Sequence, residues 1–128
     1  MRCFLFATFL VVACAAVAAA ASIEDAESAY KRGDFVLAER LNRSLAEHGV
    51  AKAQYNLGWM YAMGQGVPQD SIRAHMWYSI AAAASRDEAW RRAIRNRGHA
   101  ASQMTAAQIE KAQEMARHCQ ETKFKECD

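Results

Sequence analysis

Proline, excess charge and catalytic signatures are all scarce in this chain of 128 residues. Pro68 is the one proline, so few positions interrupt helix formation, and no strand-like alternation of apolar and polar residues stands out. Sixteen lysines and arginines face 14 aspartates and glutamates, a net charge of +2 at pH 7. So small an excess lacks the strongly basic character of nucleic-acid-binding proteins, and we expect no nucleic-acid partner.

Recognisable catalytic motifs are missing as well. The four histidines (His48, His75, His99 and His118) fall on separate predicted segments, without a His-x-x-x-His pair. Neither a Gly-x-Ser-x-Gly segment nor a phosphate-binding loop occurs. Acidic pairs at 24–25 and 87–88 are better explained as charges at helix N-termini. We therefore expect no enzyme, no metal site and no cofactor.

Residues 1–21 have the pattern of a secretory signal peptide. Arg2 precedes a short apolar run, and a row of alanines follows it before Ser22. The apolar run is too short for a confident membrane span, so we expect none in the mature chain of residues 22–128. As an alternative, Cys14 is the lipidated residue of a lipoprotein signal. Either prediction places the protein outside the cytoplasm, in the periplasm or secreted.

Two cysteines, Cys119 and Cys127, remain after the predicted signal. An even pair in an exported protein favours a disulfide. One straight helix would hold the two residues about 12 Å apart, too far for the bond. The last helix must then end soon after Cys119 and the tail must fold back. The alternatives are two free thiols or an incomplete metal site with His118.

Helix signals follow one another along residues 22–128. Predicted helices begin at Ser22, Asp34, Asp70 and Thr105, where short polar side chains can cap the first turn, and a fifth begins at Ser85 or Asp87. Another lies between Gly49 and Gly64. Gly98 is expected to weaken or end the fifth helix. The sequence predicts an all-α fold of about six helices, paired as antiparallel hairpins in a short α-solenoid.

Residues 53–82 carry an ordered motif, and residues 46–53 recur loosely at 81–89. The motif resembles the Sel1-like repeat, a relative of the tetratricopeptide repeat. The resemblance implies a complete repeat at about 51–86, a degenerate repeat before it, and a capping helix at about 105–121. Its members are Ala53, Leu57-Gly58, Tyr61, Gly64, Gly66-Val67, Asp70, Arg73-Ala74, Trp77-Tyr78 and Ala81-Ala82.

Packing physics gives these motif residues structural roles. Small residues allow close helix approach, and the aromatic side chains each bury on the order of 150–250 Å² between helices. Glycines permit backbone angles that other residues resist, and Asp70 can cap the following helix. We assign structural roles to Ala53, Leu57, Gly58, Tyr61, Gly64, Gly66, Asp70, Ala74, Trp77, Tyr78 and Ala81.

Residues left over after packing are candidates for binding a partner. Tyr55 and Trp59 lie on the helix face opposite Leu57, with Met63 one turn further on. Aromatic residues and methionine often anchor protein partners. The alternative is that a neighbouring hairpin covers them.

The second candidate surface is basic. Arg86, Arg91, Arg92, Arg95 and Arg97 lie on or beside the fifth predicted helix, and we select Arg91 and Arg95 as partner-binding candidates. The alternative is a solvated surface in which Asp87 and Glu88 pair with Arg91 and Arg92.

The resemblance to the Sel1-like family implies an adaptor that binds another protein or peptide. The sequence thus predicts a protein-interaction module of the bacterial envelope. A structural accessory subunit of a larger envelope complex is an alternative. A hydrolase acting on cell wall or β-lactams is another, although the paired cysteines of β-lactam-binding relatives are missing from the repeat here.

Overall fold

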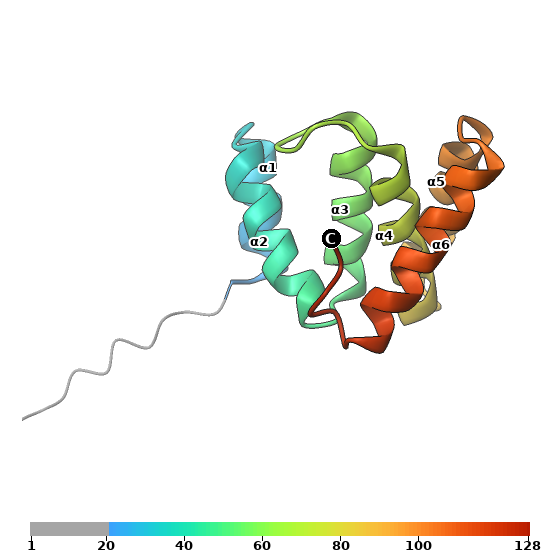
Figure 1. Cartoon of the computed structure of the whole chain (residues 1–128). Coiled ribbons are helices and arrows are strands. Elements are labelled where there is room, and N and C mark those ends of the chain that lie inside the picture. The colour runs from blue at the N-terminus through green and yellow to red at the C-terminus, as the bar shows by residue number, and fades with distance from the viewer. Residues whose placement is uncertain (1–20) are drawn as a thin grey trace, which may run out of the picture.

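A computed structural model describes residues 21–128. The predicted signal peptide and the alternative lipidation at Cys14 therefore lie almost entirely outside the described residues. Across the described part of the chain the structure is all-helical, without strands, and its helices stack in successive pairs (Figure 1). The predicted fold class is confirmed. The helices are α1 (Ile23–Lys31), α2 (Phe35–Glu47), α3 (Ala51–Met63), α4 (Ser71–Ala84), α5 (Glu88–Ser102) and α6 (Ala106–Glu121).

Local capping chemistry sets most helix starts. Ser22 and Thr105 form capping boxes with Asp25 and Gln108, and Asp34, Asp70 and Asp87 accept a hydrogen bond from the backbone of the first turn. The exception is α3, whose first turn follows Val50 without a side-chain cap. Its stability must come from burial.

One predicted boundary is wrong. Gly98 does not end α5, which continues to Ser102. Ala93 and Ala100, two turns apart on one face, are both buried, so packing holds the helix on either side of the glycine. A single exposed glycine costs only about 1 kcal/mol in a helix, and that burial outweighs it.

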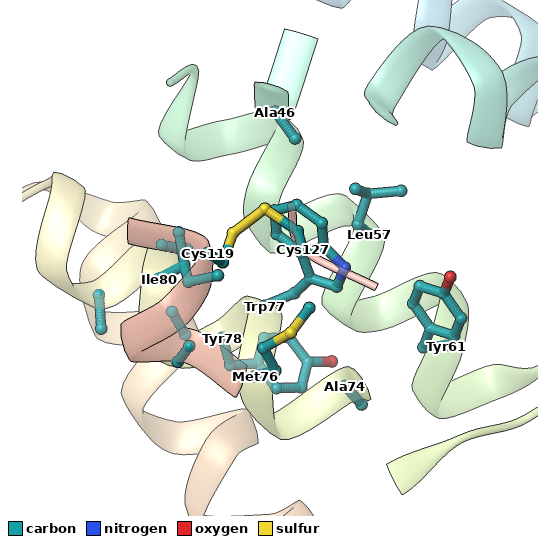
Figure 2. Packing of buried hydrophobic residues seen from close by; sticks show 14 of the residues in the cluster. Ala46, Leu57, Tyr61, Ala74, Met76, Trp77, Tyr78, Ile80, Cys119 and Cys127 are labelled. Atoms are coloured by element: carbon teal, nitrogen blue, oxygen red, sulfur yellow. A yellow bond between two sulfur atoms is a disulfide. The ribbon is translucent and has the colours of Figure 1, made fainter. Parts of the chain in front are cut away.

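The core is built around α4, which packs against α3, α5 and α6. Trp77 is fully buried, and Tyr78 is nearly so. Both belong to one apolar cluster with Leu57, Cys119 of α6 and Cys127 of the tail (Figure 2). A second cluster, around Met60, joins α1 and α2 to α3. The repeat motif is thus the packing centre of the molecule.

Two motif glycines sit where a side chain would collide. A Cβ at Gly58 would lie 2.6 Å from Cδ1 of Tyr78, so this glycine lets the Tyr78 ring lie against α3. Gly66 has φ of +75°, and a Cβ there would lie 2.3 Å from the carbonyl oxygen of Phe35. The loop after α3 can therefore rest on the start of α2.

The C-terminal tail folds back across the hairpins, as Figure 1 shows. Cys119 and Cys127 form a disulfide with Cα atoms 4.4 Å apart, and α6 ends two residues after Cys119. The expected pairing and turn are both present. Asp128 then reaches Arg43 of α2, with Oδ2 and Nη1 3.0 Å apart.

Candidate functional site

A groove of about 520 Å³ opens between α1 and α3 and is called the α1–α3 groove here. Ala26 and Met60, both buried, form its floor. Its walls carry three aromatic residues and two amides. These are Tyr30 of α1, Asn42 of α2, and Tyr55, Asn56 and Trp59 of α3. Concave surfaces of this size and mixed lining are typical of binding sites.

The hydroxyl of Tyr30 holds one side of the groove together. It donates to Oε1 of Gln65 at 2.8 Å and accepts from Nε1 of Trp59 at 3.1 Å. The Tyr30 ring also packs against Phe35, with centroids 5.1 Å apart. Trp59 is thereby oriented although its side chain remains 37% exposed. An oriented, accessible indole is a suitable anchor for a partner.

Tyr55 lies in the groove wall but is also part of the packing. Its ring centroid is 5.8 Å from that of Tyr78, and its hydroxyl accepts a hydrogen bond from Nδ2 of Asn96 at 3.2 Å. The residue therefore ties α3 to α4 and α5 and is half-buried. Of the two aromatic residues predicted to face a partner, Trp59 is the more accessible.

An amide pair supplies the polar part of the groove. Nδ2 of Asn56 donates to Oδ1 of Asn42 at 3.0 Å, and Nδ2 of Asn42 donates to the carbonyl of Ala38 at 2.9 Å. Within residues 21–128 the side-chain oxygen of Asn56 has no hydrogen-bond partner. It can accept a hydrogen bond from a peptide backbone or a polar side chain.

The charges around the groove are nearly balanced. Glu27 and Lys31 line it, and Glu27 forms an ion pair with Lys52 of α3. The hydrogen bond from Lys52 lowers the pKa of Glu27, so the carboxylate is ionised at neutral pH. With acid and base this close, the groove has little net charge to select a strongly charged partner.

The other predicted partner-binding residues lie elsewhere. Met63 is 54% exposed at the end of α3 but does not line the groove. Arg91 and Arg95 are exposed on α5, also outside it. Glu88 pairs with Arg91 and with Arg92, at 3.5 and 3.0 Å. The structure thus places the basic surface apart from the groove.

One expected ion pair is not formed. Asp87 was expected to pair with Arg91, but its Oδ1 instead accepts from the backbone N–H of Ala89 at 2.9 Å and from the Ser85 hydroxyl. The carboxylate is needed as the helix cap, and these hydrogen bonds lower its pKa.

The structural motif residues occupy the interior or the loop as their types require. Tyr61, Trp77 and Tyr78 are buried, and Gly64 and Gly66 have positive φ. Asp70 caps α4 and also binds Nη1 of Arg73 at 2.8 Å. The remaining motif positions that face the core, all buried, are Ala53, Leu57, Gly58, Ala74 and Ala81.

The histidines hold unrelated positions. His48 contacts the carbonyl of Ser44, His118 contacts Glu126, and His75 is buried on α4. Within residues 21–128 no cluster of three histidine, cysteine or acidic residues is arranged to hold a metal ion. In the same range no helix is both long and apolar enough to cross a bilayer.

Of the nine residues that line the groove, the sequence predicted Tyr55 and Trp59 and missed the other seven. Tyr30, Asn42 and Asn56 are among the missed residues, and all three line the site with Trp59. The one available signal was that Tyr55, Asn56 and Trp59 share a helix face. Nothing in the sequence pairs Tyr30 with a residue 29 positions away.

Comparison with known proteins finds one match. The family model of the Sel1 repeat matches residues 51–85, which span α3, the glycine-containing loop and α4. No curated protein and no solved structure matches the chain. Sel1 repeats generally mediate protein–protein interactions, and the family is typically non-enzymatic. Residues 51–85, at the packing centre of the molecule, therefore form a Sel1-like repeat.

Proposed function

We propose that this protein is a non-enzymatic adaptor of the bacterial envelope that binds a segment of another protein in the α1–α3 groove. The observation that carries the proposal is the exposed indole of Trp59, oriented by Tyr30 beside the Asn42–Asn56 amide pair. A few residues carry most of the binding energy at protein interfaces, and tryptophan and tyrosine are enriched among them.

The groove suits an uncharged, partly apolar segment. Its floor is apolar, its aromatic wall can cover an apolar side chain, and Asn56 offers an acceptor for backbone N–H groups. Because Glu27 is already paired with Lys52, a charged partner gains little from either residue. We therefore expect affinity to depend on apolar contact more than on salt.

Two features support the envelope location. Cys119 and Cys127 form a disulfide, which persists in oxidising compartments outside the cytoplasm. The sequence of residues 1–21 has the order of charge, apolar run and small residues found in signal peptides. Sequencing the mature N-terminus tests this: a start near Ser22 supports export by cleavage, and a lipidated Cys14 supports anchoring instead.

Photo-crosslinking in cells tests the binding site. A photoreactive residue at position 31, exposed in the wall of the groove, should give a discrete crosslinked product, whereas one at Glu110 on α6, exposed and outside the groove, should not. A synthetic peptide covering the crosslinked segment should then bind the purified protein in calorimetry. Trp59→Ala should weaken that binding by about tenfold or more while the helical circular dichroism is retained.

The outcomes separate the alternatives. Identical products from positions 31 and 110, or peptide binding that Trp59→Ala leaves unchanged, would contradict the proposed site. A stoichiometric complex that survives purification in high salt would support a permanent accessory subunit instead. Turnover of a cell-wall or β-lactam substrate that one histidine substitution abolishes would support an enzyme.

A further inference from the structure

A second cavity, of about 440 Å³, lies among α4, α5 and α6 and is called the α4–α6 cavity here. His75 and Ser79, one turn apart on α4, face Gln113, Arg117 and Gln120 of α6 across it, and Arg97 enters from α5. Apart from two alanines, all of its lining residues are polar or basic. None of its helices contributes to the α1–α3 groove.

His75 is an unusual residue for this position. It is 4% exposed, and Nδ1 is buried without a hydrogen-bond partner within residues 21–128. Gln54 and Trp77 also have an unpartnered buried atom, but His75 is the one of the three that lines this cavity. A buried ring nitrogen without a partner costs free energy unless a ligand or water satisfies it.

The two arginines of the cavity lack acidic partners. Arg97 is half-buried and Arg117 is exposed, and neither forms an ion pair within residues 21–128. Four arginines pair with carboxylates, and four others in the same range (Arg32, Arg40, Arg86 and Arg95) do not, so what sets Arg97 and Arg117 apart is that both line this cavity. Burial lowers the pKa of His75, and the nearby positive charge of Arg97 lowers it further, which favours the neutral ring. None of the residues that line the cavity is acidic, so the charges of Arg97 and Arg117 are not balanced within it.

We infer that the α4–α6 cavity binds an oxyanion, a phosphate or carboxylate group, between the guanidinium groups of Arg97 and Arg117 with His75 at its base. Guanidinium groups bind both anions through paired hydrogen bonds. Ser79, Gln113 and Gln120 add uncharged donors around the same space. The His75 ring lines the same cavity, so an anion bound there lies beside it and favours its protonated form.

Histidine NMR gives a direct test on the purified, oxidised protein. The pKa of His75 is measured at constant ionic strength in chloride and with added inorganic phosphate. Bound phosphate should raise that pKa, because an anion beside the ring favours the imidazolium. The change should saturate with a Kd on the order of 1 mM or tighter. A parallel titration with N-acetylglutamate amide tests a carboxylate of the kind a protein side chain would supply.

Matched variants locate the effect. Arg97→Gln and Arg117→Gln should each weaken binding by about fivefold or more, whereas Arg91→Gln, on the same helix as Arg97 but outside the cavity, should leave it unchanged. Saturation by phosphate alone supports a free anion, and saturation by the glutamate analogue supports a carboxylate source. If neither probe changes the His75 resonance, or if both cavity variants respond like the wild type, the inference is overturned.

Discussion

Two glycines inside helices have opposite surroundings, which makes them a matched pair. At Gly58 a Cβ would lie 2.6 Å from Cδ1 of Tyr78, and the Tyr78 ring is buried and cannot move away cheaply. We predict that Gly58→Ala lowers the free energy of unfolding by about 1–3 kcal/mol, because the ring or the α3 backbone must shift. Urea denaturation followed by circular dichroism measures the change.

Gly98→Ala is the control for that prediction. Around Gly98 nothing lies within 4 Å of an added Cβ, and its φ is not positive. The substitution should raise the free energy of unfolding by about 0.5–1 kcal/mol, since alanine favours the helix and loses less backbone entropy. If both variants lost the same free energy of unfolding, the contact with Tyr78 would not explain why glycine is needed at position 58.

Tyr55 and Trp59, one helical turn apart, should also behave differently. Trp59→Ala should change the free energy of unfolding by less than about 1 kcal/mol, because the indole is partly exposed and its loss leaves the core intact. Tyr55→Ala should cost about 2 kcal/mol, because it removes the contact with Tyr78 and the hydrogen bond from Asn96. Urea denaturation of the two variants compares them, and a larger loss for Trp59→Ala would contradict this division.

The difference between these two residues could not be predicted from sequence. Helical spacing puts both on the face opposite Leu57, but it does not say which neighbours reach that face. Asn96 meets Tyr55 across 41 positions, and Tyr30 meets Trp59 across 29. Long-range contacts of this kind depend on how the hairpins stack, and local periodicity carries no information about that.

The sequence predicts where helices start more accurately than where they end. A start needs one side chain that bonds the first turn, and Ser22, Asp34, Asp70 and Thr105 all do so. Where a helix ends depends on whether the residues beyond a position of low helix propensity are buried against the rest of the protein. Ala100 packs beyond Gly98, so α5 continues where local propensity alone would stop it.

The cap of α4 should make the stability of this helix depend on pH. Although burial raises the pKa of Asp70, hydrogen bonds from the backbone and side chain of Arg73 outweigh it and leave the pKa below its ordinary value. A lowered folded-state pKa contributes stability above the unfolded-state pKa, and that contribution is lost as pH falls through the folded-state value. Asp70→Asn keeps the cap but not the charge, so the variant should be less stable at pH 7 by about 1 kcal/mol or less.

Urea denaturation between pH 7 and pH 2 measures that difference. The free energies of unfolding of wild type and Asp70→Asn should converge at the acid end of this range. Asp34→Asn is the matched control, because Asp34 caps α2 without an ion pair within residues 21–128. A pH-dependent loss as large for Asp34→Asn as for Asp70→Asn would contradict the role given to Arg73.

For the molecule as a whole, the C-terminal tail links α2, the turn after α2, and α4. Phe124 packs against Gly49, in the turn between α2 and α3, where a Cβ would lie 3.4 Å from the ring. Asp128 lies between Arg43 of α2 and Arg73 of α4, at 3.0 and 3.6 Å. Arg43 also donates to the Tyr61 hydroxyl at 2.7 Å, so the tail reaches a motif residue through one side chain.

The disulfide should therefore stabilise the whole solenoid and not only α6. Closing an eight-residue separation between Cys119 and Cys127 is worth about 2–3 kcal/mol by restriction of the unfolded chain. We predict a loss of that size on reduction of the wild type, measured by urea denaturation with and without reductant. Cys119→Ala/Cys127→Ala should lose at least as much and should no longer respond to reductant.

Asp128→Asn should cost less than about 1 kcal/mol, because the carboxylate is 57% exposed and such pairs contribute little. If Asp128→Asn matched the effect of reduction, the ion pairs and not the covalent link would be what holds the tail against α2 and α4.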